Sequence, residues 1–208
     1  MTPREMSALT STIILVIGSI WYIIQVAKND AVKPVLATWI VTSFGTVLSF
    51  ATYWTSPHHS LVSNAYNAIS IVTINSILIS VAIKNRANGV KLSFNTFQKV
   101  CLMVSTVIAI FWAVLVWGLG GTGIVPNILI QVLMLIGYLI TAERLLSAKK
   151  NTEPLSAWWF VLVASLIAMY TGIVSRNTLS IIFASRTTFG VGLLIWLMIR
   201  AEHRSRQM

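Results

Sequence analysis

Residues 9–27 read LTSTIILVIGSIWYIIQVA, a run without a charged side chain, and Lys28-Asn29-Asp30 follow it directly. An α-helix needs about 20 predominantly apolar residues to cross the hydrocarbon core of a bilayer, so this run predicts a membrane-spanning helix. Six further apolar segments are separated by polar breaks, at 36–54, 63–83, 99–118, 124–142, 157–174 and 179–199. We therefore expect an all-α integral membrane protein with seven transmembrane helices.

The composition supports this class. Hydrophobic residues make up 56% of the 208 residues and charged residues only 10%, whereas a soluble domain has about 25% charged residues. Seven spans leave only short loops, without room for a soluble catalytic domain. The single Cys101 excludes an internal disulfide and a cysteine-based metal site.

The basic residues predict the orientation of the spans. Only two, Arg4 and Arg176, fall in the amino-terminal tail and the second, fourth and sixth loops, while 12 fall in the other loops and the carboxyl tail. The positive-inside rule then places the amino terminus outside and the carboxyl terminus in the cytoplasm. The net charge of +10 is thus explained by topology and contact with anionic lipid, and we expect no nucleic-acid partner.

The two halves of the chain contain a repeated pattern. Pro34-Val-Leu-Ala-Thr-Trp39 recurs as Pro154-Leu-Ser-Ala-Trp-Trp159, offset by 120 residues, and each copy opens an apolar span after a basic loop. Gly18 and Gly137 lie near the middle of the first and fifth spans. These matches predict two parallel three-helix repeats, residues 1–90 and 123–208, joined by a linker helix within 91–122.

A resemblance to a known group follows from these features. Ile24-Gln25-Val26-Ala27-Lys28-Asn29, a short basic loop and a span with Trp39 near its start resemble the PQ-loop pattern. With the 3+1+3 layout and the external amino terminus, the chain is similar to the SWEET and PQ-loop group of small seven-span transporters. The resemblance implies transport of a small solute, and Asn75 matches the asparagine that the group has in its third span.

Several other functions are excluded by residues that the predicted spans lack. All seven Lys residues lie in loops or at span ends, so there is no intramembrane Schiff base for retinal. The three His residues fall outside the spans, as do all carboxylates, which disfavours haem ligation and proton relays. No nucleophile–base pair or metal cluster is evident, so we expect neither enzymatic activity nor a cofactor.

Arg186 is the most informative single residue, because it lies about seven residues into the last span. A guanidinium at that depth costs a few kcal/mol unless it faces a cavity or a partner. One interpretation is that Arg186 faces the cavity between the repeats and holds an acceptor group of the solute, with Asn75 opposite. The other is that its side chain extends to the outer headgroups as an interfacial anchor.

Other polar and aromatic side chains within or at the ends of the spans complete the predicted binding site: Ser49, Tyr53, Trp54, Asn67, Ser70, Asn127, Gln131 and Tyr170. Amides and hydroxyls suit a neutral or zwitterionic solute, and the aromatic residues suit stacking on a sugar or heterocycle. The alternative is that many of the polar groups only form hydrogen bonds between packed helices.

The sequence therefore predicts facilitative transport of a small polar solute, such as a sugar or vitamin, by alternating access between the two repeats. A non-transporting receptor or sorting protein with the same architecture is the alternative. A homo-oligomer in the bilayer is compatible with either function. The absence of an Asn-x-Ser/Thr sequence favours a prokaryotic cell membrane.

Overall fold

The computed structural model describes residues 1–56, 60–90, 93–121 and 123–206, which form helices and contain no strand. Seven helices of the described residues are long and apolar enough to cross a membrane, which confirms the all-helical class and agrees with a multi-pass membrane protein. They are α1 (Pro3–Lys28), α2 (Leu36–Trp54), α3 (Ala65–Ala87), α4 (Thr96–Ala113), α5 (Ile124–Ser147), α6 (Leu155–Val174) and α7 (Thr178–Arg206). A short π-helix, η1 (Val114–Gly118), continues α4.

The helices extend beyond the apolar runs that predict them. α1 begins at Pro3 because Thr2 caps it: the Thr2 hydroxyl accepts a hydrogen bond from the backbone N–H of Glu5, and the Glu5 carboxylate accepts one from the N–H of Thr2. α7 continues to Arg206, with basic residues in its last turn, where they interact favourably with the helix dipole. Hydropathy marks the apolar middle of a helix, whereas capping and charge decide where it ends.

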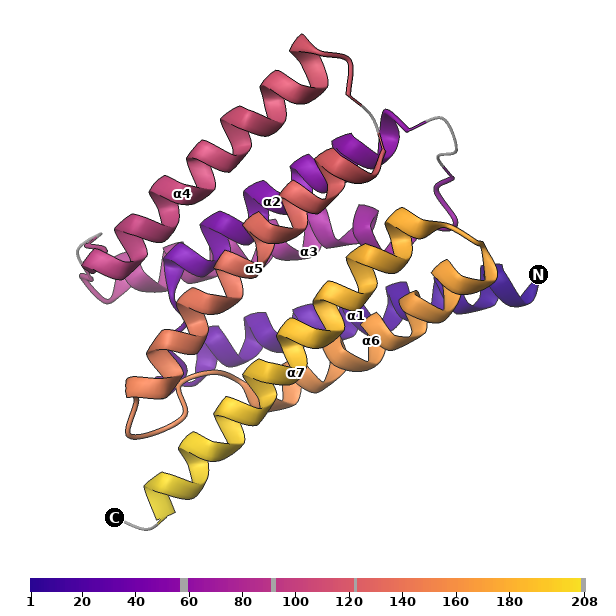
Figure 1. The fold of residues 1–208 in the computed structure, drawn as a ribbon. Helices are drawn as coiled ribbons and strands as arrows, with labels where there is room; N and C mark the ends of the chain where they lie inside the picture. The colour runs from indigo at the N-terminus through magenta and orange to yellow at the C-terminus, as the bar shows by residue number, and fades with distance from the viewer. Residues whose placement is uncertain (57–59, 91–92, 122, 207–208) are drawn as a thin grey trace.

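Six of the helices form a ring in the order α1, α3, α2, α5, α7 and α6, and we refer to α1–α3 and α5–α7 as the two groups. α3 contacts both α1 and α2, and α7 contacts both α5 and α6. The groups meet where α1 packs on α6 and where α2 packs on α5. α4 contacts α5 and, over a smaller area, α2, and it lies at one edge of the bundle (Figure 1).

Glycines allow the close approach at both contacts between the groups. A Cβ atom on Gly18 of α1 would lie 2.5 Å from the Cβ of Phe160 on α6. A Cβ atom on Gly137 of α5 would lie 2.6 Å from the Cγ2 of Thr42 on α2. Small residues at such crossings let helix backbones pack closely, which is how helices associate in an apolar solvent.

Successive helices run in opposite directions (Figure 1), so the loops fall at two ends of the bundle. We call the end with the α1–α2, α3–α4 and α5–α6 connections and the end of α7 the basic end, because most Lys and Arg residues lie there. The opposite end holds the start of α1 and the remaining connections.

Candidate functional site

A small cavity lies at the centre of the bundle, between the two groups of helices. Its volume is about 60 Å³, far below the roughly 300–1,000 Å³ of pockets for drug-sized ligands. Side chains from α1, α2, α3, α5, α6 and α7 line it, and those with polar or charged groups include Ser19, Thr38, Thr42, Tyr66, Ser70, Thr73, Tyr138, Arg186 and Thr187. Both groups of helices therefore contribute polar atoms to one central space.

Arg186 on α7 points into this interior rather than toward the ends of the helices. Its side chain is buried, with a relative exposure of 7%. The Nε–H donates to the Oε1 of Gln131 at 2.9 Å, and Nη1 donates to the hydroxyl of Tyr138 at 3.1 Å. The guanidinium carbon lies 4.8 Å from the ring centre of Phe183 and 5.5 Å from that of Tyr138.

These neighbours leave the positive charge of Arg186 without an anionic partner. Gln131 and Tyr138 are neutral acceptors, and among the described residues no carboxylate lies within ion-pair distance of the guanidinium. Arginine has five N–H donors, so the two hydrogen bonds use only part of its capacity. A buried, uncompensated guanidinium beside a cavity is suited to an anionic or strongly polar acceptor.

A chain of buried amides and hydroxyls continues from Arg186 across three helices. The Nε2 of Gln131 on α5 donates to the Oδ1 of Asn127 at 3.3 Å and to the Oγ of Ser49 on α2 at 3.5 Å. Ser49 Oγ also accepts from the Nδ2 of Asn67 on α3 at 3.2 Å. Arg186 thereby belongs to a polar network that connects the two groups of helices.

Three aromatic side chains lie at the basic end of the cavity, where Trp39 and Trp158 line it and Tyr22 packs against both. Tyr22 lies edge-on to Trp39 and to Trp158, with ring centres 5.0 and 6.1 Å away, and the two indole rings are 6.2 Å apart. We call these three residues the basic-end cluster. They come from α1, α2 and α6, so the cluster lies across the contact between the groups.

The tryptophan on α6 that faces inward is Trp158, not the Trp159 that the sequence repeat aligns with Trp39. Trp159 is 44% exposed and Trp158 only 4%. The reason is a shift of one residue at the helix start: α2 begins at Leu36, two residues after Pro34, whereas α6 begins at Leu155, directly after Pro154. Trp39 and Trp158 are each the fourth residue of their helix, so they project in equivalent directions.

Glu153 lies beneath the basic-end cluster and is 4% exposed. Its Oε2 accepts a hydrogen bond from the Tyr22 hydroxyl at 2.6 Å and a longer one from Trp158 Nε1 at 3.4 Å. Burial raises the pKa of the Glu153 carboxyl, while the Tyr22 hydroxyl, the Arg144 charge and the Trp158 N–H lower it in part. A carboxyl group thus bridges α1 and α6 at the basic end of the cavity.

At the opposite end, Tyr66 and Phe183 meet edge-on at 5.9 Å and line the cavity there. Further out, the Tyr53 hydroxyl contacts Ser63 at 2.7 Å and accepts from Asn177 Nδ2 at 3.1 Å. These contacts join α2, the α2–α3 connection and the α6–α7 connection, so they also link the two groups of helices.

The predicted site residues fall into four sets. Arg186 and Ser70 line the cavity, and the buried network beside it holds Ser49, Asn67, Asn127 and Gln131. Tyr53 lies in the hydrogen-bonded cluster at the opposite end. The remaining three are placed away from the cavity wall: Asn75, Trp54 and Tyr170.

Asn75 does not face Arg186. It accepts a hydrogen bond from Ser43 on α2 at 2.7 Å and donates to the Ile71 carbonyl of its own helix. Trp54 is 48% exposed and stacks on Phe50, and Tyr170 is 52% exposed. The depth of a residue in a span can be read from the sequence, but the face on which it lies is fixed by helix packing.

Sequence reasoning missed the residues that enclose the cavity. Tyr138, Trp39 and Trp158 are apolar or amphipathic residues within apolar spans, so they give no signal of a polar site. Glu153 lies outside the predicted spans, so the sequence does not mark it as buried. Its only signal is Pro154, which follows it directly and stands at the start of α6. The histidine pair His58-His59 lies outside the described residues.

Comparisons with protein-family models, with curated proteins and with solved structures gave no match. The function is therefore inferred from the geometry of the cavity and its surroundings.

Proposed function

We propose that the protein is a facilitative transporter of a small polar solute, which binds in the central cavity between two parallel three-helix repeats. The observation that carries this proposal is the buried guanidinium of Arg186, which lacks an anionic partner and lines a cavity to which both groups contribute. In this proposal the amino terminus lies outside and the basic end faces the cytoplasm of a prokaryotic cell.

The helix contacts support a repeat of α1–α3 in α5–α7. The contact of α1 with α6 corresponds to that of α5 with α2, as a twofold axis along the membrane normal requires. Gly18 and Gly137 mark these two contacts, and they have the same separation in sequence, 119 residues, as Trp39 and Trp158. Tyr66 on α3 and Phe183 on α7 also meet across the centre.

The chemistry of the cavity narrows the class of solute. The guanidinium, the Tyr138 hydroxyl and the threonine hydroxyls of α2 and α7 donate or accept hydrogen bonds, while Trp39 and Trp158 supply apolar faces. Such a wall suits a solute with a carboxylate or a cluster of oxygen acceptors on a compact apolar frame. The resemblance to the SWEET and PQ-loop group agrees with a sugar, a vitamin or a similar small molecule.

The two aromatic boundaries suggest how access alternates. In the present conformation Tyr66 and Phe183 close one side, and the basic-end cluster with Glu153 closes the other. Each boundary contains residues from both groups. When one group rocks against the other, the residues of one boundary move apart while those of the second boundary stay in contact. The cavity of about 60 Å³ is enlarged as the solute enters.

The test begins with thermal unfolding of the purified protein in the presence of sugars, vitamins, nucleosides and amino acids. A compound that binds the folded state raises the melting temperature, and such compounds are then tested as labelled solutes in proteoliposomes. We expect flux by the wild type, loss of flux in Arg186→Leu, and unchanged flux in the matched control Arg200→Leu, whose side chain is exposed on the same helix.

Stabilisation by a compound without flux would indicate the receptor alternative. Equal flux by wild type and Arg186→Leu would remove Arg186 from the binding site. The site would then be reduced to the hydroxyl and amide groups of α2, α3 and α5.

A further inference from the structure

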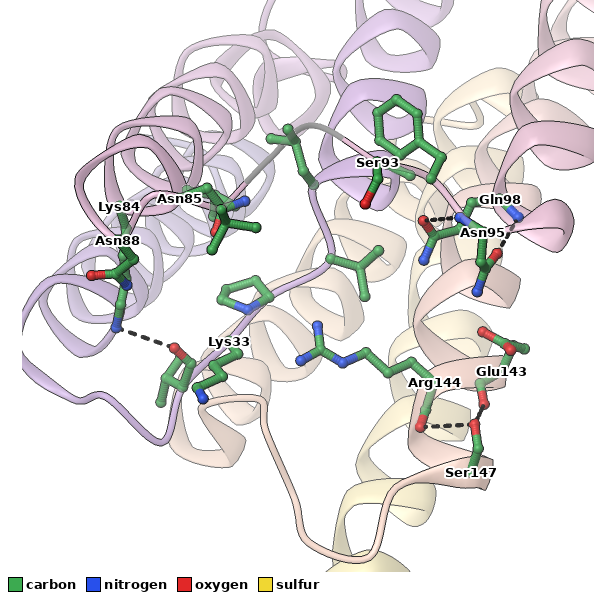
Figure 2. Close-up of a pocket in the computed structure, with 18 of the residues that line it drawn as sticks. Lys33, Lys84, Asn85, Asn88, Ser93, Asn95, Gln98, Glu143, Arg144 and Ser147 are labelled. Atoms are coloured by element: carbon green, nitrogen blue, oxygen red, sulfur yellow. Dashed lines mark hydrogen bonds between the residues drawn. The ribbon is translucent and has the colours of Figure 1, made fainter.

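A second and larger cavity opens at the basic end, away from the central site. Its volume is about 840 Å³, and it lies between the start of α2, the end of α3, the start of α4 and the end of α5 (Figure 2). This is within the range of pockets that enclose a small molecule or a lipid headgroup. The residues that line it are not among those of the central cavity.

Arg144 of α5 is the central cation of this pocket. Figure 2 shows its side chain extending from α5 into the cavity, toward the segment that holds Lys33. The Arg144 guanidinium is half-buried and donates no hydrogen bond to any described residue. Lys33 likewise has no side-chain partner within the described part of the chain. The Arg144 charge also acts on the buried Glu153 carboxyl, but neither cation forms an ion pair with a described carboxylate, so both can bind a ligand at this wall.

Lys84, the third cation of the pocket wall, differs from Arg144 and Lys33 because its ammonium group already has partners in the protein. Its Nζ donates to the carbonyls of Asn29 at 2.8 Å and Val32 at 3.2 Å, and Asp30 lies 3.9 Å away. Lys84 therefore fixes the α1–α2 connection against α3 and adds positive potential to the pocket wall. The second carboxylate of the wall, Glu143, forms no ion pair with Arg144 within the described residues.

The start of α2 adds backbone donors to the same wall. Val35, Leu36 and Ala37 all line the pocket, and no side chain caps this helix. The first N–H groups of a helix have no partner within the helix, and its dipole places partial positive charge there. An uncapped helix start beside an arginine and a lysine is an arrangement that binds phosphate groups.

We infer that this pocket binds a phosphate-bearing anion through Arg144, Lys33 and the amino-terminal turn of α2. The amides of Asn85, Asn88 and Gln98 line the remaining wall and suit the hydroxyl groups of a polar head. The pocket lies among helix ends at the basic end, where anionic lipid headgroups bind many membrane proteins. A soluble phosphate compound would present the same chemistry.

The test measures the melting temperature of the protein in nanodiscs. One arm compares phosphatidylcholine with a mixture containing phosphatidylglycerol, and a second adds inorganic phosphate to phosphatidylcholine nanodiscs at constant ionic strength. At about ten times Kd we expect a rise of roughly 3–6 °C for a protein of this size. The rise should be lost in Arg144→Gln and reduced in Lys33→Gln, and kept in Arg86→Gln, an exposed arginine at the same end that does not line the pocket.

A rise with phosphatidylglycerol alone assigns the pocket to a lipid headgroup, and a rise with inorganic phosphate assigns it to a soluble phosphate compound. If Arg144→Gln does not fold, Lys33→Gln decides, because its side chain is exposed and its loss should not disturb packing. No rise in either arm, or an equal rise in the wild type and the pocket variants, overturns the inference.

Discussion

Replacing Arg186 by Leu and by Lys separates the cost of its charge from the value of its hydrogen bonds. Arg186→Leu removes two hydrogen bonds from a charged donor, each worth about 1.5–3 kcal/mol. It also removes a guanidinium whose burial in a membrane costs about 2.5–3.5 kcal/mol on insertion scales. The difference predicts that Arg186→Leu lowers the free energy of unfolding by only about 0–3 kcal/mol.

Arg186→Lys keeps the charge but loses the planar fork that reaches Gln131 and Tyr138 together. The cost of a buried charge remains while at least one hydrogen bond is lost, so we expect Lys to destabilise the protein more than Leu. Equilibrium unfolding in mixed micelles, without added solute, measures this order. If Arg186→Lys is as stable as the wild type and Arg186→Leu is much less stable, the charge has a stabilising partner, and the reasoning on the site is wrong.

Three further predictions concern the basic end, the helix contacts and the topology. Burial raises the pKa of the Glu153 carboxyl in the folded protein, so protonation stabilises the fold at low pH, and this stabilisation is lost as the pH rises from the usual carboxyl range through the raised pKa. The melting temperature of Glu153→Gln minus that of the wild type should therefore increase with pH. A constant difference would contradict the burial argument. Gly18→Ala should cost about 1–3 kcal/mol by overpacking against α6, whereas Gly192→Ala, with no atom near the added Cβ, should be neutral in the same unfolding assay. In a cysteine-free background, a membrane-impermeant thiol reagent applied to intact cells should label a cysteine at position 119 and not at 149, and the reverse pattern would invert the proposed orientation.

The sequence predicts the number and positions of the helices well. Seven uncharged or nearly uncharged runs are long enough to span a bilayer, and a helix satisfies all its backbone hydrogen bonds within one such run. The depth of Arg186 in its span was also predictable, because each residue adds a fixed rise along a helix. The sequence repeat also pairs Gly18 with Gly137, and both glycines lie at close helix contacts in the structure.

The composition of the site was only partly predictable. Gln131 and Asn127 lie four residues apart on one helix, so their hydrogen bond follows from helical geometry. Asn75 has the residue type and depth of a binding residue, yet its amide is used to join α3 to Ser43 of α2. Trp159 was aligned with Trp39, but a one-residue difference in the helix start turns Trp158 inward instead.

Seven apolar helices with basic loops at one end can be predicted from the sequence, because those properties depend on local hydrophobicity, length and charge. Which face of each helix is buried, and which side chains meet, follows from the packing of the helices. Contacts such as those of Arg186 with Tyr138 and of Glu153 with Tyr22 join residues 48 and 131 positions apart. They depend on the rotation and close approach of packed helices, which no local pattern in the chain specifies.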